Sequence, residues 1–465
     1  MKRFLVVALG VCAAAGAALS TDVAAQNRQI GINIALKTDI TSSILADLSR
    51  HGSVLDTMPA IDALTMRIAE SELPAIRSKS YVAAASPDAE RKGSPVDAVA
   101  ATEFSTGINT WDLDAVNVTD FGSTSRKVAQ DGTGVYVAVL DTGLLDSWRQ
   151  YFPQERIATQ FAAAFSGGGG ERGATPTLDN KWEHDQNSHG THVTSTILGY
   201  QFGAAAVNGV APRATVIPVK VLNQNGSGWS SMIAAGIVYV TDLARGPLAG
   251  HPVVINMSLG GSQLDAVEKA AVDYAVANGV IVVASAGNEG EAGMGFPGAY
   301  APVISVAASG WTGEWTTPTS NWWRTLDVAD PTAARDFYIT DFSSREKAGQ
   351  DLDVAAPGSW VVGPFQNQSG NLSYFFLGGT SMASPHVAGI AALMMQKDAT
   401  LRQAQVETIL ESTAIALPAG CRKVIDPNVG PTEFCWGADA TGAGLATADR
   451  ALAAVGGATV SAKRK

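Results

Sequence analysis

From residue 135 onward, short runs of apolar and mostly β-branched residues alternate with longer segments in which apolar positions recur at helical spacing. Such continuous runs are typical of strands buried on both faces, and they predict strands at 135–140, 216–221, 253–257, 280–283 and 303–306. The longer segments predict helices at 192–200, 230–243, 264–278, 381–396 and 401–412. This alternation predicts an α/β fold in three layers, with a mostly parallel sheet covered by helices on both faces.

Residues 26–100 have a different pattern. Strand-like stretches occur at 44–45, 54–55, 61–69 and 81–84, and Ser71 with an acidic residue after it is typical of a helix start. The stretch 88–99 is charged and contains proline, which predicts an exposed linker. A small α+β module followed by a cuttable linker is typical of a pro-domain, and a separate binding domain is the alternative.

The first 25 residues have the features of a signal peptide. Lys2 and Arg3 precede an apolar run, and small residues at 23–25 offer a cleavage site. A membrane anchor is the alternative, but a run of about 16 apolar residues is short for a span. We therefore expect a protein secreted to the outside of the cell or to the periplasm, free of the membrane after cleavage. The predicted parts are 1–25, 26–100 and a main domain at 101–465.

Composition and cysteine content narrow the class of protein. A hydrophobic content of 46% and a charged content of 16% describe a globular chain, and the net charge of −11 argues against nucleic acid as a partner. Cys12 leaves with the signal peptide, so Cys421 and Cys435 remain. In an oxidising compartment they are expected to form a disulfide, worth about 3 kcal/mol for a loop of this size. Two free thiols are the alternative.

Four short motifs carry the candidate chemistry. Asp141 closes a predicted strand, His189 begins a predicted helix, Asn288 follows another strand, and Ser381 stands at the start of a small-residue helix. In this order they supply an acid to orient an imidazole, the imidazole as base, an amide as oxyanion donor and a hydroxyl as nucleophile. The spacing of His189 and His192 is also that of a pair of metal ligands. We predict no metal there, because the glutamate of a zinc-protease helix is missing, and we expect His192 to be structural.

The order Asp, His, Ser and the flanking motifs resemble those of the subtilisin-like serine proteases, the subtilases. The resemblance extends to the segments 185–187, 254–261 and 352–358, and it covers the chain from about Trp111 to Val455. It implies a serine endopeptidase with a subtilisin-like fold that acts through an acyl-enzyme and needs no cofactor. It also implies polypeptide substrates and a self-processing precursor whose own pro-domain is a partner, and we expect a monomer.

The same resemblance implies the substrate-binding residues. One wall of the main specificity pocket is expected from Ser258, Leu259 and Gly260, and the other from Ala284, Ser285, Ala286 and Gly287. Gly295 is expected at the pocket floor, where glycine leaves room for a large apolar side chain. Gly226, Ser227 and Gly228 are expected to form an edge strand that pairs with the substrate backbone. The linker of the pro-domain is expected to lie along this strand, with the maturation cut between Val99 and Asn109.

Some segments depart from the family pattern. Thr194-Ser195-Thr196 replaces the usual Ala-Gly-Thr. The segment 201–210 offers side-chain oxygens only from Gln201 and Asn208, whereas calcium takes about 6–8 oxygen ligands, so a structural calcium ion is possible but unsupported. An insertion at 310–341 holds four tryptophans and is expected to pack on itself as a surface loop, with a rim of the cleft as the alternative.

Two other functions stay open at this point. A binding protein that kept the fold without activity would not be labelled by a fluorophosphonate, whereas an active enzyme would. An acyl hydrolase acting on esters or lipids would be labelled but would leave casein intact.

Overall fold

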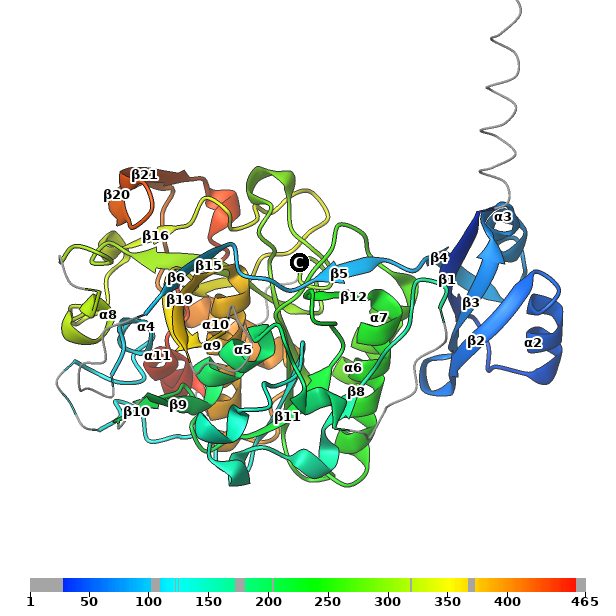
Figure 1. Cartoon of the computed structure of the whole chain (residues 1–465), viewed down its shortest axis with the longest axis horizontal. Helices are drawn as coiled ribbons and strands as arrows, with labels where there is room; N and C mark the ends of the chain where they lie inside the picture. The colour runs from blue at the N-terminus through cyan, green and yellow to red at the C-terminus, as the bar shows by residue number, and fades with distance from the viewer. Residues whose placement is uncertain are drawn as a thin grey trace, which may run out of the picture.

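The computed structural model describes residues 28–101, 109–121, 123, 125–171, 180–202, 205–317, 320–366 and 373–456. The expected signal peptide and Cys12 lie outside these residues. Figure 1 shows a small N-terminal unit, drawn in blue, beside a much larger unit. Among the described residues, no helix has both the length and the apolar character needed to cross a membrane.

The N-terminal unit, residues 28–87, is a four-stranded antiparallel sheet with two helices. Its elements are β1 (Gln29–Leu36), α2 (Ser42–Leu48), β2 (Gly52–Met58), β3 (Ala63–Ala69), α3 (Leu73–Arg77) and β4 (Val82–Pro87). The strand order is β2-β3-β1-β4. Alternate apolar residues of these strands, such as Ile32, Ile34 and Met66, form a separate small core.

Two local predictions for this unit were wrong. Residues 44–45 belong to a helix instead of a strand, because the Thr41 hydroxyl accepts a hydrogen bond from the backbone N–H of Ile44 and begins α2. Ser71 is not the cap of α3, since it lies in a preceding 3₁₀ turn. The strand β1 was missed, although Ile30, Ile32 and Ile34 alternate with Gly31 and Asn33 in the pattern of a strand.

The larger unit is built on an eight-stranded sheet. Its strands are β7 (Tyr136–Asp141), β8 (Ala163–Ala164), β11 (Thr215–Lys220), β13 (Val253–Met257), β14 (Ile281–Ser285), β15 (Ile304–Trp311), β16 (Phe337–Ile339) and β17 (Val354–Pro357). The order is β16-β15-β14-β13-β7-β11-β8, with β17 paired to β15. Only β16 pairs antiparallel within the described sheet. The predicted parallel sheet is confirmed.

Helices cover both faces of this sheet, as predicted. One layer contains α6 (Ser230–Arg245) and α7 (Ala266–Ala277), and the other contains α5 (His189–Leu198), α9 (Thr380–Lys397), α10 (Gln403–Thr413) and α11 (Ala448–Ala454). Strand alternation explains the apolar runs: in β7, Val137 and Val139 pack on the α5 and α9 side, while Ala138 and Leu140 pack on the α6 and α7 side.

Residues 88–101, which we call the crossing segment, run from the N-terminal unit across the larger unit (Figure 1). Its strand β5 (Glu90–Lys92) pairs antiparallel with β12 (Ser227–Trp229). Its strand β6 (Asp97–Ala100) pairs with β19 (Tyr374–Gly378), which itself pairs with β18 (Val361–Pro364). The prediction of an exposed linker is wrong here, because Asp88, Arg91 and Gly93 are buried against the larger unit.

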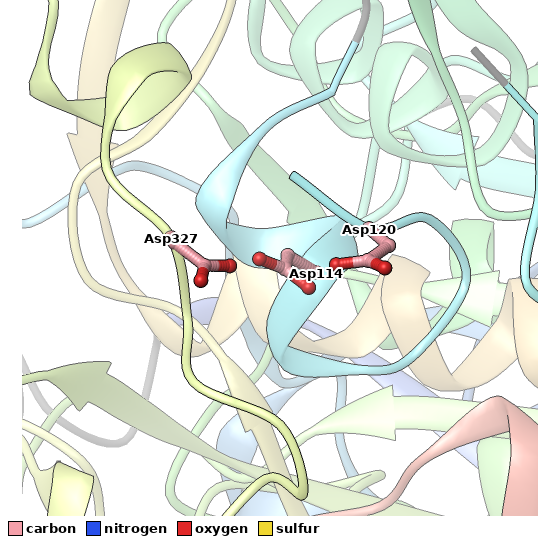
Figure 2. A group of neighbouring side chains, drawn as sticks. All are labelled: Asp114, Asp120 and Asp327. Carbon is pink, nitrogen blue, oxygen red and sulfur yellow. The ribbon is translucent and has the colours of Figure 1, made fainter. Parts of the chain in front are cut away.

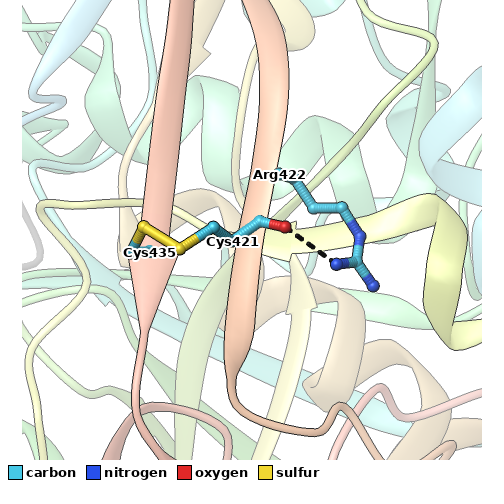
Figure 3. Close-up of a disulfide and its surroundings, with 3 residues drawn as sticks. All are labelled: Cys421, Arg422 and Cys435. Carbon is cyan, nitrogen blue, oxygen red and sulfur yellow. Dashed lines mark hydrogen bonds between the residues drawn. A yellow bond between two sulfur atoms is a disulfide. The ribbon is translucent and has the colours of Figure 1, made fainter.

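A hairpin near the C-terminal end carries the predicted disulfide. Its strands are β20 (Gly420–Asp426) and β21 (Gly430–Trp436), and the register sets Cys421 opposite Cys435. Figure 3 shows the bond between the two sulfur atoms, which confirms the pairing. The guanidinium of Arg422 donates to the carbonyl oxygen of Cys421 and lies over the Trp436 ring. The hairpin packs beside β16.

The tryptophan-rich insertion is part of the core of the larger unit. Trp322 and Trp323, in α8 (Trp322–Thr325), are buried. Trp311 stacks on Trp111 with ring centroids 6.4 Å apart, and Trp322 stacks on Phe376 at 5.8 Å. The insertion therefore packs on α4 (Trp111–Ala115) and β19, and the prediction of a self-contained surface loop is wrong. Large aromatic rings gain more from such shared burial than from contacts within one loop.

Candidate active site

Asp141 and His189 form a buried hydrogen-bonded pair at the carboxyl end of β7. The Nδ1–H group of His189 donates to both carboxylate oxygens of Asp141, at 2.8 and 3.0 Å, and both side chains are inaccessible to solvent. Gly190 permits this approach, since a Cβ atom there would lie 2.4 Å from the carbonyl oxygen of Gly143. The arrangement fixes the imidazole with Nε2 as its free nitrogen.

Thr142 and Asp185 form a hydrogen-bonded network next to this pair. The Thr142 hydroxyl donates to Asp185 at 2.8 Å and accepts from the backbone N–H of Gly190 at 2.9 Å. Asp185 also accepts from the backbone N–H groups of Asn187 and Ser188, at 2.9 and 2.8 Å. These bonds tie the start of α5 to the end of β7. Asp185 belongs to one of the motifs that resemble the family, whereas no spacing rule in the sequence reveals the role of the Thr142 hydroxyl.

Ser381 is the second residue of α9. A proline four residues later changes the hydrogen bonding of its backbone carbonyl oxygen. Pro385 has no N–H to donate to the carbonyl oxygen of Ser381. That oxygen instead accepts from the Ser258 hydroxyl at 2.8 Å. The Ser381 hydroxyl donates to the carbonyl oxygen of Ser258 at 3.3 Å, a weak bond that leaves it easy to reorient. Nε2 of His189 is buried and has no hydrogen-bond partner among the described residues.

Asn288 lies beside the start of α9. Its side-chain oxygen accepts from the backbone N–H of Thr380 at 2.9 Å and from the Thr380 hydroxyl at 2.8 Å. Both bonds occupy the oxygen, so the amide nitrogen is the end of the side chain left to donate. Thr380 therefore orients the predicted oxyanion donor, a role that the sequence analysis missed. The sequence contained a signal for this role, because Thr380 directly precedes the candidate nucleophile Ser381.

A cleft of about 620 Å³ is lined by Asn288, Thr380 and Ser381. Predicted residues that line it are Leu259, Gly260, Ser285, Gly287, Asn288 and Ser381. Ser258 contacts Ser381, and Gly226 accepts a hydrogen bond from the crossing segment. Ala284, Ala286 and Gly295 do not line the cleft. They are buried, and the Gly295 N–H donates to the carbonyl oxygen of Ala286 at 2.8 Å.

His192 is held as a buried, neutral side chain. Burial, and to a smaller extent the neighbouring His189, lower its pKa to about 3. Its Nε2 atom lies 3.1 Å from the carbonyl oxygen of Val361, which fixes the ring beside β18. The two acidic clusters found among the described residues contain no histidine. This environment agrees with the structural role expected for His192.

Figure 2 shows an acidic cluster of Asp114, Asp120 and Asp327, none of which lines the cleft. Burial raises the pKa of Asp114 to about 7, and the Lys127 ammonium lies 3.8 Å from its Oδ1 atom. Three carboxylates supply three oxygen ligands if each binds through one oxygen, and calcium takes about 6–8, so further ligands or bidentate binding would be needed. Because Lys127 already provides a positive charge, the cluster fits calcium only in part. The segment 201–210, considered for calcium above, contributes to a hairpin of β9 (Gly199–Phe202) and β10 (Ala205–Asn208).

Comparison with known proteins places this site in a family. A family model described as "Subtilase family" matches residues 132–450. The chain belongs to the subtilase family. Subtilisin DY of Bacillus licheniformis is 36% identical to this subtilase over 290 residues, covering 62% of this chain and 85% of that protein. Subtilisin E of Bacillus subtilis is also 36% identical over 290 residues, which are 62% of each chain.

Solved structures show the same fold. Fervidolysin from Fervidobacterium pennivorans, described as a keratinolytic enzyme related to subtilisin, matches with a TM-score of 0.63 at 22% identity, over 92% of this chain and 61% of that one. Sphericase matches with a TM-score of 0.52 at 27% identity, over 74% of this chain and 99% of that one. This subtilase is a serine-type endopeptidase, a hydrolase whose chemistry needs no cofactor.

Proposed function

We propose that this subtilase is a secreted endopeptidase that acts through Asp141, His189 and Ser381, with Asn288 as oxyanion donor, and that it is made as a self-processing precursor. The observation that carries the proposal is the orientation of His189. Its Nδ1–H group is bound to the buried carboxylate of Asp141, so its unpartnered Nε2 is the nitrogen left to act as base. Ser381 and Asn288 line the same cleft.

The proposed reaction has two halves. The Ser381 hydroxyl oxygen attacks the scissile carbonyl carbon while Nε2 of His189 takes the hydroxyl proton, and Asp141 stabilises the imidazolium. The carbonyl oxygen becomes an oxyanion, to which the Asn288 amide donates. His189 then gives the proton to the leaving amine as the carbon–nitrogen bond breaks. Water repeats the sequence on the acyl-enzyme, with His189 as base, and frees Ser381.

The crossing segment supports an extended polypeptide as the substrate. Its Lys92 exchanges two backbone hydrogen bonds with Gly260, both 2.9 Å, and the Gly93 N–H donates to the carbonyl oxygen of Gly226 at 2.9 Å. Gly93 lies close to the candidate catalytic groups, since a Cβ atom there would be 3.4 Å from Cε1 of His189. An extended chain thus fits between two backbone edges, which is recognition by strand addition.

Labelling tests the mechanism directly. After secretion and processing, a fluorophosphonate should attach to Ser381, as located by peptide mass, and the protein should hydrolyse casein. Unfolded protein is the control and should not react, because an ordinary serine hydroxyl is a weak nucleophile. Folded, processed protein without a label would support a silent binding protein. A labelled protein that cleaves esters but leaves casein intact would support an acyl hydrolase.

We further propose that residues 26–100 are the pro-domain, and that they inhibit the mature monomeric enzyme. Asp88 of the crossing segment lies at the start of α6, where it accepts from the Ser231 backbone N–H at 3.0 Å and from the Ser231 hydroxyl at 2.6 Å. A carboxylate at this end of a helix is stabilised by the helix dipole. The proposed cut between Val99 and Asn109 falls largely on residues 102–108, outside the described residues. The path of the crossing segment favours a first cut before β6, because Gly93 is the residue that lies beside His189. The cut between Val99 and Asn109 would then be a later one.

The ion pair of Arg91 and Glu268 should control the affinity of this inhibitor. Both side chains are fully buried, and the guanidinium donates to the carboxylate through Nε at 3.0 Å and through Nη2 at 2.5 Å. Arg91→Met would leave the Glu268 carboxylate buried without its partner, which costs several kcal/mol. We expect residues 26–100 carrying this change, added to the mature enzyme, to inhibit about 100-fold more weakly.

The matched control is Arg67→Met, because Arg67 is exposed on β3 of the same module. Inhibition constants and circular dichroism of both variants separate lost contact from lost folding. Equal inhibition by the Arg91 and Arg67 variants would contradict the proposed role of the ion pair. No inhibition by the unchanged module at micromolar concentration would contradict the pro-domain assignment.

A further inference from the structure

The crossing segment continues beyond the candidate nucleophile as a paired strand. The Val96 N–H donates to the carbonyl oxygen of Gly378 at 2.7 Å, and the Ala101 N–H donates to that of Tyr374 at 2.8 Å. Between them, β6 pairs antiparallel with β19, with Asp97 opposite Gly378. Since β19 leads directly into Ser381, the leaving side of a substrate has a backbone edge on which to lie.

A second cavity of about 260 Å³ opens beside β6, and residues of the crossing segment contribute to its wall. The crossing segment supplies Val96 and Asp97, and the strand β16 with the residues after it supplies Tyr338, Thr340, Asp341 and Phe342. The other lining residues are Ser359 and Trp360 together with Asp426, Val429, Thr432 and Phe434 of the disulfide hairpin. The cavity therefore stands where a substrate side chain would point if the substrate followed the path of the crossing segment.

The cavity is negatively charged at its rim. Asp341 and Asp426 contribute carboxylates, and none of the lining residues named above is basic. Asp97 is a poor occupant: burial raises its pKa, and the negative charges of Asp426 and Asp341 raise it further. Both wall carboxylates are fixed by backbone donors, since Asp341 accepts from the Phe342 N–H at 2.8 Å and Asp426 accepts from the Asn428 N–H at 2.7 Å.

The floor of the cavity suits a long aliphatic stem. Tyr338 and Phe434 stack with ring centroids 5.3 Å apart and an interplanar angle of 12°, and Trp360 lies beside them in the wall. Lysine and arginine pack their methylene groups on such apolar surfaces and keep the charged head at a polar rim. The Cys421–Cys435 bond links the two strands that carry Asp426 and Phe434 (Figure 3).

We propose that this cavity, lined by Asp341, Asp426 and the rings of Tyr338 and Phe434, is a specificity pocket that binds a lysine or arginine side chain on the leaving side of the substrate. The inference rests on the proposed function, because it assigns substrate residues to the same cleft. It follows that in the precursor Asp97 of the crossing segment occupies this pocket. Because its negative charge is unfavourable there, the crossing segment binds the pocket less tightly than a basic substrate does.

The test uses quenched fluorescent peptides and the processed enzyme. Each of the first four positions after the cut bond is varied in turn among lysine, alanine and aspartate. We expect kcat/KM to favour lysine over aspartate about ten-fold at one of these positions. The preference should weaken at 1 M salt, since the rim charges are open to solvent. In the double variant Asp341→Asn, Asp426→Asn the preference should fall to about two-fold.

Asparagine retains the oxygen that accepts the backbone bonds, so these changes remove charge and keep the local turn. The control is Glu433→Gln, because Glu433 lies between Thr432 and Phe434 on β21 and strand alternation directs it away from the cavity. Peptide hydrolysis with equal rates for lysine and aspartate at all four positions overturns the pocket and leaves the proposed function intact. A loss of preference in Glu433→Gln equal to that in the double variant also overturns it. Failure to cut any peptide would instead contradict the proposed function.

Discussion

Ser381→Ala is expected to abolish proteolysis and to leave an uncut precursor that lacks only its signal peptide. The groups of a catalytic triad act as a unit, so loss of the nucleophile should lower kcat by roughly 10⁶-fold. Stability should change little, because the one bond that the hydroxyl makes within the described part of the chain is 3.3 Å long, to the carbonyl oxygen of Ser258. The measurements are N-terminal sequencing and mass of the secreted protein, casein hydrolysis and the melting temperature.

Ser412→Ala is the matched control, since Ser412 is exposed near the end of α10 and does not line the cleft. It should mature at the same N-terminus as the unchanged protein. Expression in a host without other secreted proteases is essential, because cutting in trans would hide the effect. Normal maturation of the Ser381 variant in such a host would rule out self-processing.

Asn288→Ala is expected to lower kcat by about 10²–10³-fold and to leave KM nearly unchanged. The amide nitrogen of Asn288 would donate to the carbonyl oxygen only as that oxygen becomes charged, so its loss affects the transition state more than the bound substrate. The Thr380 hydroxyl donates to the side-chain oxygen of Asn288 at 2.8 Å and so fixes the orientation of the amide. Thr380→Val should therefore cause a smaller loss of kcat, about ten-fold, through misorientation of Asn288.

Two further variants test whether these losses are specific to the Thr380 hydroxyl and to Asn288. Thr380→Ser keeps the hydroxyl and should restore most of the activity that Thr380→Val loses. Asn278→Ala changes an exposed asparagine at the end of α7 and should leave both constants as they are. A loss that appears in KM alone, or a loss of kcat below ten-fold for Asn288→Ala, would remove Asn288 from the proposed mechanism.

Local pattern determined much of this protein before its structure was described. Each apolar run predicted in the larger unit is a strand of the central sheet, because a strand buried on both faces has no polar alternation to obscure it. The order of Asp141, His189 and Ser381 and their flanking motifs were sufficient to indicate the family, which the match to residues 132–450 shows. The disulfide followed from only two cysteines in the expected mature chain.

Tertiary structure alone decided the features that depend on contacts between distant segments. The stretch 88–99 has the composition of an exposed linker, yet Arg91 is buried because its partner, Glu268, lies on a helix of the larger unit. The tryptophans of the insertion are buried because Trp111 and Phe376 meet them from far along the chain. The cavity beside β6 needs Asp341 and Asp426 together with the crossing segment. The sequence shows no periodic pattern for such groups of residues. The free energy that holds them together comes from burial and charge pairing between segments that are far apart in the chain.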